Sequence, residues 1–385
     1  MATIRKRCDS YQIRVSCGYD SNNKQVIRTK TWKPNKNMTP KQVEKELNKQ
    51  AVLFEEACMN GFMTSAIKFS DFMERWKDEY AKKHLKMTTL DTIGQKVKRI
   101  NEEIGHMRLD KISKRTIQEL IQSLLNGNSK HKPLCAKTVK NYVSFVSSIL
   151  NYAIRLDMLS INPCSNASLP PIKKVQREMY SLEEAQHFIN TLIEKAPLLY
   201  QCYFILMIYS GLRRGEICGL TWDDIDFENH IITVNNALYH ITDKGATLDT
   251  PKTTTSNRSL KLCDEVFTYL NRLQEYYKVE KSRLGVKWQD NNFVFKRDDG
   301  NVISPLTPNE WFHRFCDKEG LKYVVPHSFR HLCASLMIES GASVKTVQAC
   351  LGHSEASTTL NIYAHAFSKA QARASEAVAN NFKLA

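Results

Sequence analysis

The spacing of apolar residues changes along the chain, and this change limits the possible folds more than any other feature of the sequence. Residues 1–36 alternate polar and β-favouring types around a turn-forming stretch at 18–23, which predicts a small antiparallel sheet. From Phe69 to Ile161 the apolar spacing is helical, in four successive segments. Four amphipathic helices can bury their apolar faces against one another, so a separate helical bundle is expected after the sheet.

Breaks in the pattern predict the domain boundaries. Residues 39–61 carry the signals of a single helix, with a proline at its start and a glycine at its end. Asn162-Pro163 is expected to end the last helix of the bundle, and residues 165–178, with adjacent prolines and adjacent lysines, are typical of a linker. The expected divisions of the 385 residues are 1–63, 64–164, the linker 165–178, and 179–385.

The last division begins with a capping box, Ser181-x-x-Glu184, and then mixes helices with a short β region from Ile231 to Leu262. The fold class predicted for the whole chain is therefore mainly α and multidomain. It consists of a small three-stranded sheet with one helix, a helical bundle, and a mixed α+β domain.

The charge of the chain is strongly positive. It contains 55 Lys and Arg against 40 Asp and Glu, a net charge of +15 with a pI near 9.2. A polyanionic partner is implied, and nucleic acid is the commonest one. The excess is dense before Asn37, where the acids are Asp9 and Asp20 and the cations are Arg5, Lys6, Arg7, Arg14, Lys24, Arg28, Lys30, Lys33 and Lys36.

Other features exclude a membrane-spanning or disulfide-stabilised protein. The longest strongly apolar stretch, Tyr203 to Tyr209, is far shorter than the ~20 residues that cross a bilayer. The N-terminus has no apolar signal core, and the 11 cysteines are scattered singly without a Cys-x-x-Cys pair. We therefore expect a protein of the reducing cytoplasm.

Five short motifs in the last division carry groups suited to chemistry. In the first, an apolar helix is expected to break at Gly211, and Arg213 can then be aimed into a cleft. The same spacing fits a surface arginine paired with Glu216. In the second, Lys252 is expected on a hairpin-like turn between strands, where a lysine is normally only solvated.

The third motif is Pro326-His327-Ser328-Phe329-Arg330-His331. With Ser328 as a helix N-cap after the strand-like residues 323–325, His327 and Arg330 can both point at one anion. A metal site is the alternative, since His327 and His331 are four apart and further ligands lie nearby: Cys333, Cys350 and His353. It is the weaker alternative, because Arg330 would repel a cation.

The last two motifs surround His353 and Tyr363. A helix from Ser343 to Leu351 is expected to end at Gly352, which leaves His353 in a turn before the helix that carries Tyr363. This outline also fits a DNA-reading helix-turn-helix, and a lone tyrosine is more often part of a core. Taken together, however, two arginines, two histidines, a lysine and a tyrosine form a phosphoryl-transfer site that needs no metal or cofactor.

The order of these motifs resembles that of the tyrosine recombinase (phage integrase) family. The matching patterns are Ser-Gly-x-Arg-x-x-Glu, a lysine on a β turn, His-x-x-Arg-His, Leu-Gly-His and Tyr-x-His. The resemblance implies that Arg213 and Arg330 clamp the phosphate that is cut and that Tyr363 is the nucleophile. It further implies site-specific recombination through a 3′-phosphotyrosine and a Holliday junction.

The same resemblance implies Lys252 as the general acid, His327 as the base and His353 as a hydrogen-bond donor to the phosphate. Three neighbouring positions depart mildly from the family pattern, where threonine, leucine and a small polar residue are commoner: Ser210, Phe329 and Leu332. All six chemical positions keep the expected residue type.

By resemblance, residues 1–63 are an arm-type DNA-binding domain, 64–164 a core-binding domain and 179–385 the catalytic domain of an integrase from a phage or conjugative transposon. The implied partners are double-stranded DNA at core-type and arm-type sites, further copies in a homotetramer, and an accessory DNA-bending or directionality factor. The residues expected to contact DNA are Arg5, Lys6, Arg7, Arg14, Arg28, Lys30, Lys137 and Lys140.

Two other functions compete with recombination. A type IB topoisomerase uses similar chemistry as a monomer, but the small basic N-terminal domain suits a second DNA site. A non-catalytic DNA-binding regulator would account for the charge and the helix-turn-helix outline. A regulator of this kind would not explain why five residues suited to chemistry occur together: Arg213, Lys252, His327, Arg330 and Tyr363.

Overall fold

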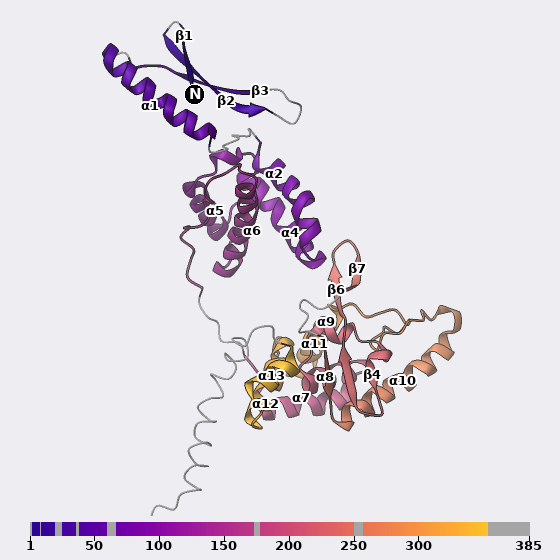
Figure 1. Ribbon diagram of the computed structural model, residues 1–385. Helices are drawn as coiled ribbons and strands as arrows, with labels where there is room; N and C mark the ends of the chain where they lie inside the picture. The colour runs from indigo at the N-terminus through magenta and orange to yellow at the C-terminus, as the bar shows by residue number, and fades with distance from the viewer. Residues whose placement is uncertain are drawn as a thin grey trace, which may run out of the picture. The chain divides into compact units, whose positions relative to one another are not determined.

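The computed structural model describes residues 2–7, 9–19, 25–35, 38–59, 67–172, 178–249 and 257–352. The chain separates into two compact units, Met1–Lys174 and Val175–Ala385, whose elements are labelled in Figure 1. The boundary between the units falls inside the expected linker. Within the described ranges, no helix is both long and apolar enough to cross a membrane.

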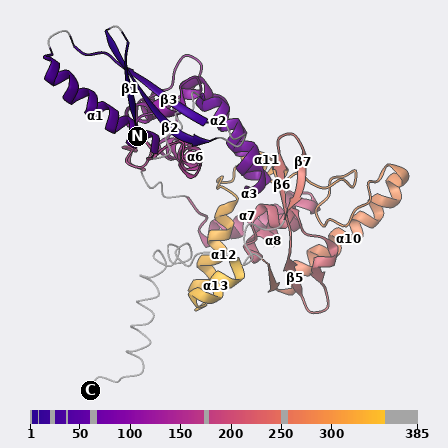
Figure 2. The ribbon, with the colours of Figure 1, turned by 45° about the horizontal axis from the view of Figure 1, so that its top comes forward.

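The N-terminal sheet is antiparallel, with strands β1 (Thr3–Arg7), β2 (Ser10–Tyr19) and β3 (Gln25–Trp32) in that order. Helix α1 (Pro40–Met59) lies along one face, where its Leu47 and Ala51 pack against Ile13 of β2 (Figure 2). The predicted sheet and helix are both confirmed. Strand β2 continues to Tyr19 through a register shift, so it extends into the stretch predicted as a turn.

The helical bundle has a core of its own, in which Phe69, Trp76 and Ile149 are almost completely buried. Four groups of elements correspond to the four predicted segments: α2 (Phe69–Trp76) with the π-helical turn η1 (Lys77–Ala81) and α3 (Lys82–His84), α4 (Met87–Ile100) with η2 (Asn101–Gly105), α5 (Lys114–Asn126), and α6 (Ala136–Arg155). The short η3 (Leu109–Lys111) lies between the second and third groups.

The predicted end of the last bundle helix is wrong by several residues. Helix α6 ends at Arg155, and Asp157 has a φ of 55°, a left-handed conformation that stops the helix. Asn162 is instead buried, and its Nδ2 donates to the carbonyl of Ser147 (3.1 Å) and to Oδ1 of Asn151 (2.7 Å). It therefore fastens the chain back onto α6 rather than capping it.

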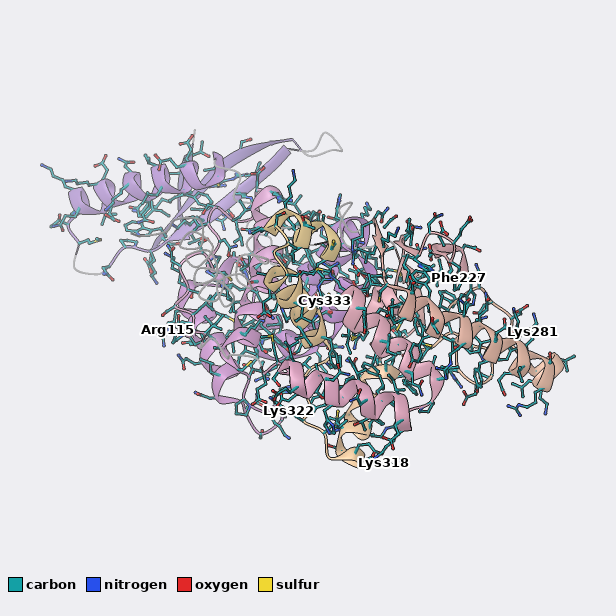
Figure 3. The ribbon with its side chains drawn as sticks, turned by 90° about the horizontal axis from the view of Figure 1, so that it is seen from below. Arg115, Phe227, Lys281, Lys318, Lys322 and Cys333 are labelled. Atoms are coloured by element: carbon teal, nitrogen blue, oxygen red, sulfur yellow. The ribbon has the colours of Figure 1, made fainter. Side chains whose placement is uncertain are left out.

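The second unit is built around α8 (Leu198–Ser210), which is apolar on nearly every side and almost wholly buried. The helices that surround it in one core are α7 (Leu182–Lys195), α10 (Asp264–Leu284), α11 (Thr307–Glu319) and α12 (His327–Glu339). Shorter elements complete the unit: α9 (Arg214–Cys218), η4 (Trp222–Asp224), η6 (Gly285–Lys287) and α13 (Val344–Leu351). Figure 3 shows Lys281 near the outer end of α10.

Two small sheets flank these helices. Strands β4 (Ile225–Asp226), β5 (Ile231–Val234) and β8 (Arg258–Lys261) form one, and β6 (Ala237–Ile241) and β7 (Gly245–Asp249) form a separate hairpin. The predicted β region is confirmed. The turn predicted for Lys252 lies outside the described residues. The described strands before and after it belong to different sheets, because β7 pairs with β6 and β8 pairs with β5.

Candidate active site

Three arginines meet at the C-terminal end of α13. The Nε of Arg258 donates to the carbonyl of Cys350 (2.7 Å), the Nη2 of Arg330 to that of Leu351 (2.5 Å), and the Nη2 of Arg213 to that of Gly352 (2.7 Å). The last carbonyls of a helix have no partner within the helix and carry the negative end of its dipole. They can therefore hold guanidinium groups, which brings three cations from three different elements together.

Two glycines make this meeting possible. Gly211 ends α8 with a φ of 61° and Gly352 ends α13 with a φ of 65°, so both helices close in the left-handed conformation that glycine favours. A Cβ at Gly211 would lie 2.5 Å from the Cδ2 of Leu351. The break expected at Gly211 is confirmed, and a side chain there would have to displace Leu351 as well as adopt a strained φ.

A buried carboxylate lies between two of the arginines. The Nη1 of Arg213 donates to the Oε1 of Glu216 (2.6 Å), and the Nη2 of Arg258 donates to its Oε2 (2.9 Å). The backbone N–H of Arg213 also donates to Oε2 (2.9 Å), which fixes the start of α9. The Arg213–Glu216 pair considered from the spacing is thus present, but Glu216 is only 2% exposed.

Charge keeps Glu216 ionised in this setting. Burial by itself would raise its pKa, but the hydrogen bond and charge of Arg258, together with Arg213, outweigh burial and lower the pKa below its ordinary value. The carboxylate therefore stays negative and orients both guanidinium groups.

Arg330 is the most buried of the three, at 2% exposure. Its Nη1 donates to the carbonyl of Gly211 (2.7 Å), in addition to the bond with Leu351. Burial and the neighbouring charges of Arg213 and Arg258 lower the pKa of Arg330 to about 9, so the side chain remains charged at neutral pH. Three guanidinium groups around one carboxylate leave an excess of positive charge, which suits a phosphate.

His327 is placed by the start of α12. The helix begins at His327 after Pro326, and Ser328 is its second residue, buried with its hydroxyl donating to the carbonyl of Glu178 (3.3 Å). The prediction of Ser328 as the N-cap is therefore wrong, and residues 323–325 do not form a strand. His327 is exposed, one turn before the buried Arg330.

The metal alternative has no support in the described part of the chain. His327 and His331 lie close, with ring centroids 5.1 Å apart. Among the residues that the structure describes, however, no group of three or more His, Cys, Asp or Glu side chains could hold a metal ion.

Three of the six predicted chemical residues lie outside the described ranges: Lys252, His353 and Tyr363. Along the chain, His353 directly follows Gly352, whose carbonyl binds Arg213, and Lys252 comes before Arg258.

Arg258 is the residue that reading the sequence missed. Its signal was present, because Arg258 is in phase with Leu260 and Leu262 on one strand and should share their inward-facing side. An arginine at an inward position of a strand needs a partner, and here Glu216 supplies it.

The predicted DNA-contacting cations fall into distinct groups. On the N-terminal sheet, Arg5 pairs with Gln12, Arg7 with Ser10 and Arg14 with Thr3, and these side chains share the face opposite α1, which we call the outer face. The three arginines on it are exposed. Residues Lys6, Arg28 and Lys30 pair with residues of the α1-covered face.

Three of the predicted lysines, Lys30, Lys137 and Lys140, differ in their surroundings. The Nζ of Lys30 donates to Oε1 of Gln50 on α1 (2.9 Å), so this lysine has a partner within its own domain. Lys137 and Lys140 are exposed near the start of α6.

Comparison with known proteins gives two family matches. The model described as "Phage integrase family" matches residues 179–370, and the model described as "Phage integrase, N-terminal SAM-like domain" matches residues 68–125. A tyrosine recombinase XerC-like protein of Caldanaerobacter subterraneus subsp. tengcongensis is 27% identical over 98% of this chain and 98% of its own length. The ICEBs1 integrase of Bacillus subtilis is also 27% identical, over 71% of this chain and 72% of its own length.

Two solved structures share the fold. The Tn1549 transposon integrase bound to transposon right-end DNA has a TM-score of 0.68 at 22% identity, covering 81% of this chain and 100% of the other. A lambda integrase tetramer bound to a Holliday junction has a TM-score of 0.55 at 17% identity, covering 92% of this chain and 94% of the other. The helical bundle and the second unit therefore have the architecture of integrases.

Proposed function

The chain belongs to the phage integrase family of tyrosine recombinases, and from that premise we propose that its arginine cluster binds the DNA phosphate that is cut. The protein is a site-specific recombinase. In the proposal, Arg213 and Arg330 neutralise the non-bridging oxygens of the phosphate, and Tyr363 attacks the phosphorus.

One observation carries this proposal. Three arginines from α8–α9, β8 and α12 are gathered by the carbonyls that end α13, with the carboxylate of Glu216 between two of them. Cations held so rigidly are preorganised for an anion and need little reorganisation when it arrives. The family motif independently assigns two of these arginines to the phosphate.

The proposed reaction balances without metal or nucleotide. The Oη of Tyr363 forms a bond to phosphorus, the bond to the 5′-oxygen breaks, and Lys252 gives that oxygen its proton. His327 accepts the phenolic proton, and His353 donates a hydrogen bond to the phosphate. The 3′-phosphotyrosine keeps the energy of the broken ester, so the 5′-hydroxyl of a partner duplex can attack it and release Tyr363.

A free tyrosine has a pKa near 10, so its phenol is a weak nucleophile at neutral pH. Nearby guanidinium groups favour the phenolate and the charge that develops on the phosphate. This is the reason that the proposal needs the cluster and not merely a basic surface.

The remaining assignments follow the same family. We assign residues 1–63 to arm-type DNA and 64–164 to core-type DNA, with Lys137 and Lys140 among the contacts. The lambda integrase structure is a tetramer on a Holliday junction, which supports a homotetramer here. An accessory factor would set direction, and the reaction would take place on DNA in the bacterial cytoplasm.

Trapping the covalent intermediate tests the proposal. On a nicked suicide substrate the wild-type protein should form a covalent protein–DNA adduct, and Tyr363→Phe should bind the same DNA yet form none. An adduct that persists in the variant would place the nucleophile elsewhere, with Tyr323, 40% exposed, the first to test.

A further inference from the structure

Arg258 joins three elements through its guanidinium group. It starts on β8, opposite Val234 of β5, and its side chain is only 7% exposed. The Nη2 donates to Oε2 of Glu216 on α9 (2.9 Å), and the Nε donates to the carbonyl of Cys350 at the end of α13 (2.7 Å). A buried arginine that donates to groups on two other elements is placed to control their spacing.

Glu216 creates the need for such a residue. Its Oε1 accepts from Arg213 at 2.6 Å, so without another cation its negative charge would act mainly on the arginine that the phosphate requires. Arg258 binds the other carboxylate oxygen and offsets that charge. Arg213 can then be oriented by Glu216 without being neutralised by it.

The negative charge of the transition state also calls for a third arginine in the cluster. A phosphodiester carries one negative charge, and attack by a tyrosinate brings a second, so the transition state carries two. Among the residues that the structure describes here, three guanidinium groups and one carboxylate carry a net charge of +2, to which Lys252 would add in the proposed reaction. Removing Arg258 would lower the positive charge available to the transition state by one.

The geometry at Gly352 also supports a positioning role for Arg258. A Cβ at Gly352 would lie 2.8 Å from the Nη1 of Arg258, so the guanidinium lies directly against the backbone there. That backbone also carries the carbonyl that binds Arg213. Arg258 therefore fixes the chain at the point where it leaves α13.

We propose that Arg258 is a positioning residue of the phosphate clamp, which acts by neutralising Glu216 and by holding the end of α13. This inference rests on the proposed function, since it assumes that Arg213 and Arg330 bind the phosphate. It assigns to Arg258 no contact with the DNA.

The first test is the rate of strand cleavage by Arg258→Met, measured in single turnover on the suicide substrate. We expect a loss of about 10- to 100-fold, the range typical of residues that orient a reactive group through another group. Arg297→Met is the matched control, because it makes the same substitution at an arginine of the same unit that is 61% exposed and pairs only at the surface with Asp299, and it should cleave at the wild-type rate.

The second test uses Glu216→Gln together with Arg258→Met. If Arg258 acts by neutralising Glu216, removing the carboxylate should restore most of the cleavage that Arg258→Met loses, so the two losses should not multiply. Losses that simply multiply would overturn the inference. Should Arg258→Met fail to fold, as judged by circular dichroism, the double variant and Arg258→Lys carry the comparison, since the first has no carboxylate at position 216 and the second keeps a cation beside it.

The third test separates positioning through charge from a structural effect. A methylphosphonate at the cleaved position removes one negative charge from the DNA. A variant whose clamp carries less positive charge should therefore lose less of its cleavage rate on this substrate than on ordinary DNA. The ratio of wild-type to Arg258→Met rates should therefore shrink toward one on this substrate. A ratio equal to that on ordinary DNA would assign Arg258 a structural role only.

Arg213→Ala distinguishes failure of the proposed phosphate clamp from failure of the role assigned to Arg258. If Arg213→Ala cleaves ordinary DNA at the wild-type rate, the phosphate clamp itself is wrong. If Arg213→Ala is slow while Arg258→Met cleaves normally, the clamp stands and only the assignment of Arg258 fails.

Discussion

Arginines occur in two opposite settings in this molecule. On the outer face of the N-terminal sheet, Arg5, Arg7 and Arg14 are exposed on strands that alternate in and out. In the second unit, Arg258 and Arg330 are buried, and each donates to two partners within the protein. The first group holds its charge in water, whereas the second holds it in a fixed geometry away from water.

This difference separates two uses of the same side chain. Exposed cations attract phosphates by charge, release counterions, and can be exchanged for lysine with modest loss. Buried guanidinium groups depend on their planar shape and several donors, which lysine lacks. We therefore expect the outer face to set affinity and the cluster to set rate.

The largest expected effect is a complete separation of the two activities. Deleting residues 1–63 should abolish binding to a distal arm-type site but leave cleavage at the crossover site, because the bundle has a core separate from that of the sheet and α1. Gel-shift titration at several salt concentrations measures this, and the full-length protein should lose affinity more steeply with salt. Equal arm binding by both forms would refute the domain assignment.

The next effect tests whether Lys252 takes part in the reaction or only attracts DNA by its charge. As a general acid it should speed departure of the 5′-oxygen by about 10²–10⁴-fold. Lys252→Ala should thus cleave ordinary DNA slowly but cleave a 5′-phosphorothiolate at nearly the wild-type rate, since a thiolate leaves without a proton. Lys252→Arg should behave like alanine, because an arginine does not release its proton.

The outcome against this assignment is equally specific. If sulfur fails to rescue Lys252→Ala, the lysine is a clamp or structural contact. Rescue of Lys244→Ala or Lys261→Ala instead would move the acid to a neighbouring lysine, and Arg213→Ala should stay slow on both substrates.

A smaller effect tests whether shape matters more than charge. Arg330→Lys should slow cleavage by about 10²–10³-fold, the cost of losing one preorganised donor, with little change in DNA binding. A lysine cannot reach the carbonyls of both Gly211 and Leu351 and a phosphate, and burial would disfavour its charge. The matched change is Arg5, Arg7 and Arg14 together to lysine, which should leave cleavage and most of the affinity intact.

The smallest effect is on stability at low pH. The pKa of Glu216 lies below its ordinary value of 4.5, so its contribution to stability is complete above that pH and is lost as the pH falls through the folded value. Glu216→Gln should flatten the fall in unfolding free energy below pH 4.5 by at most about 1.4 kcal/mol per pH unit. Urea unfolding at several acidic pH values measures the slopes, and equal slopes would contradict the ionised pair.

Much of the local structure could be predicted. The capping box of Ser181 and Glu184 and the end of α13 at Gly352 are as expected, because each depends on hydrogen bonds between residues a few positions apart. The helices predicted for the bundle from the spacing of apolar residues are also confirmed, since a helix that buries one face needs that spacing. The wrong predictions for Ser328 and for the end of α6 concern residues whose partners are distant, Glu178 and Ser147.

The sequence by itself thus determined the small sheet, the helical bundle, some of the helix ends, and the motif positions of Arg213 and Arg330. Only the tertiary structure decided that Arg258 joins them, that Lys30 bonds to α1, and that the strands on either side of Lys252 belong to different sheets. Local signals act over one or two helical turns, but the bonds of Arg258 to Glu216 and Cys350 span 42 and 92 residues. Whether a charge is buried, and which partner compensates it, is settled only when such distant segments come together in the folded core.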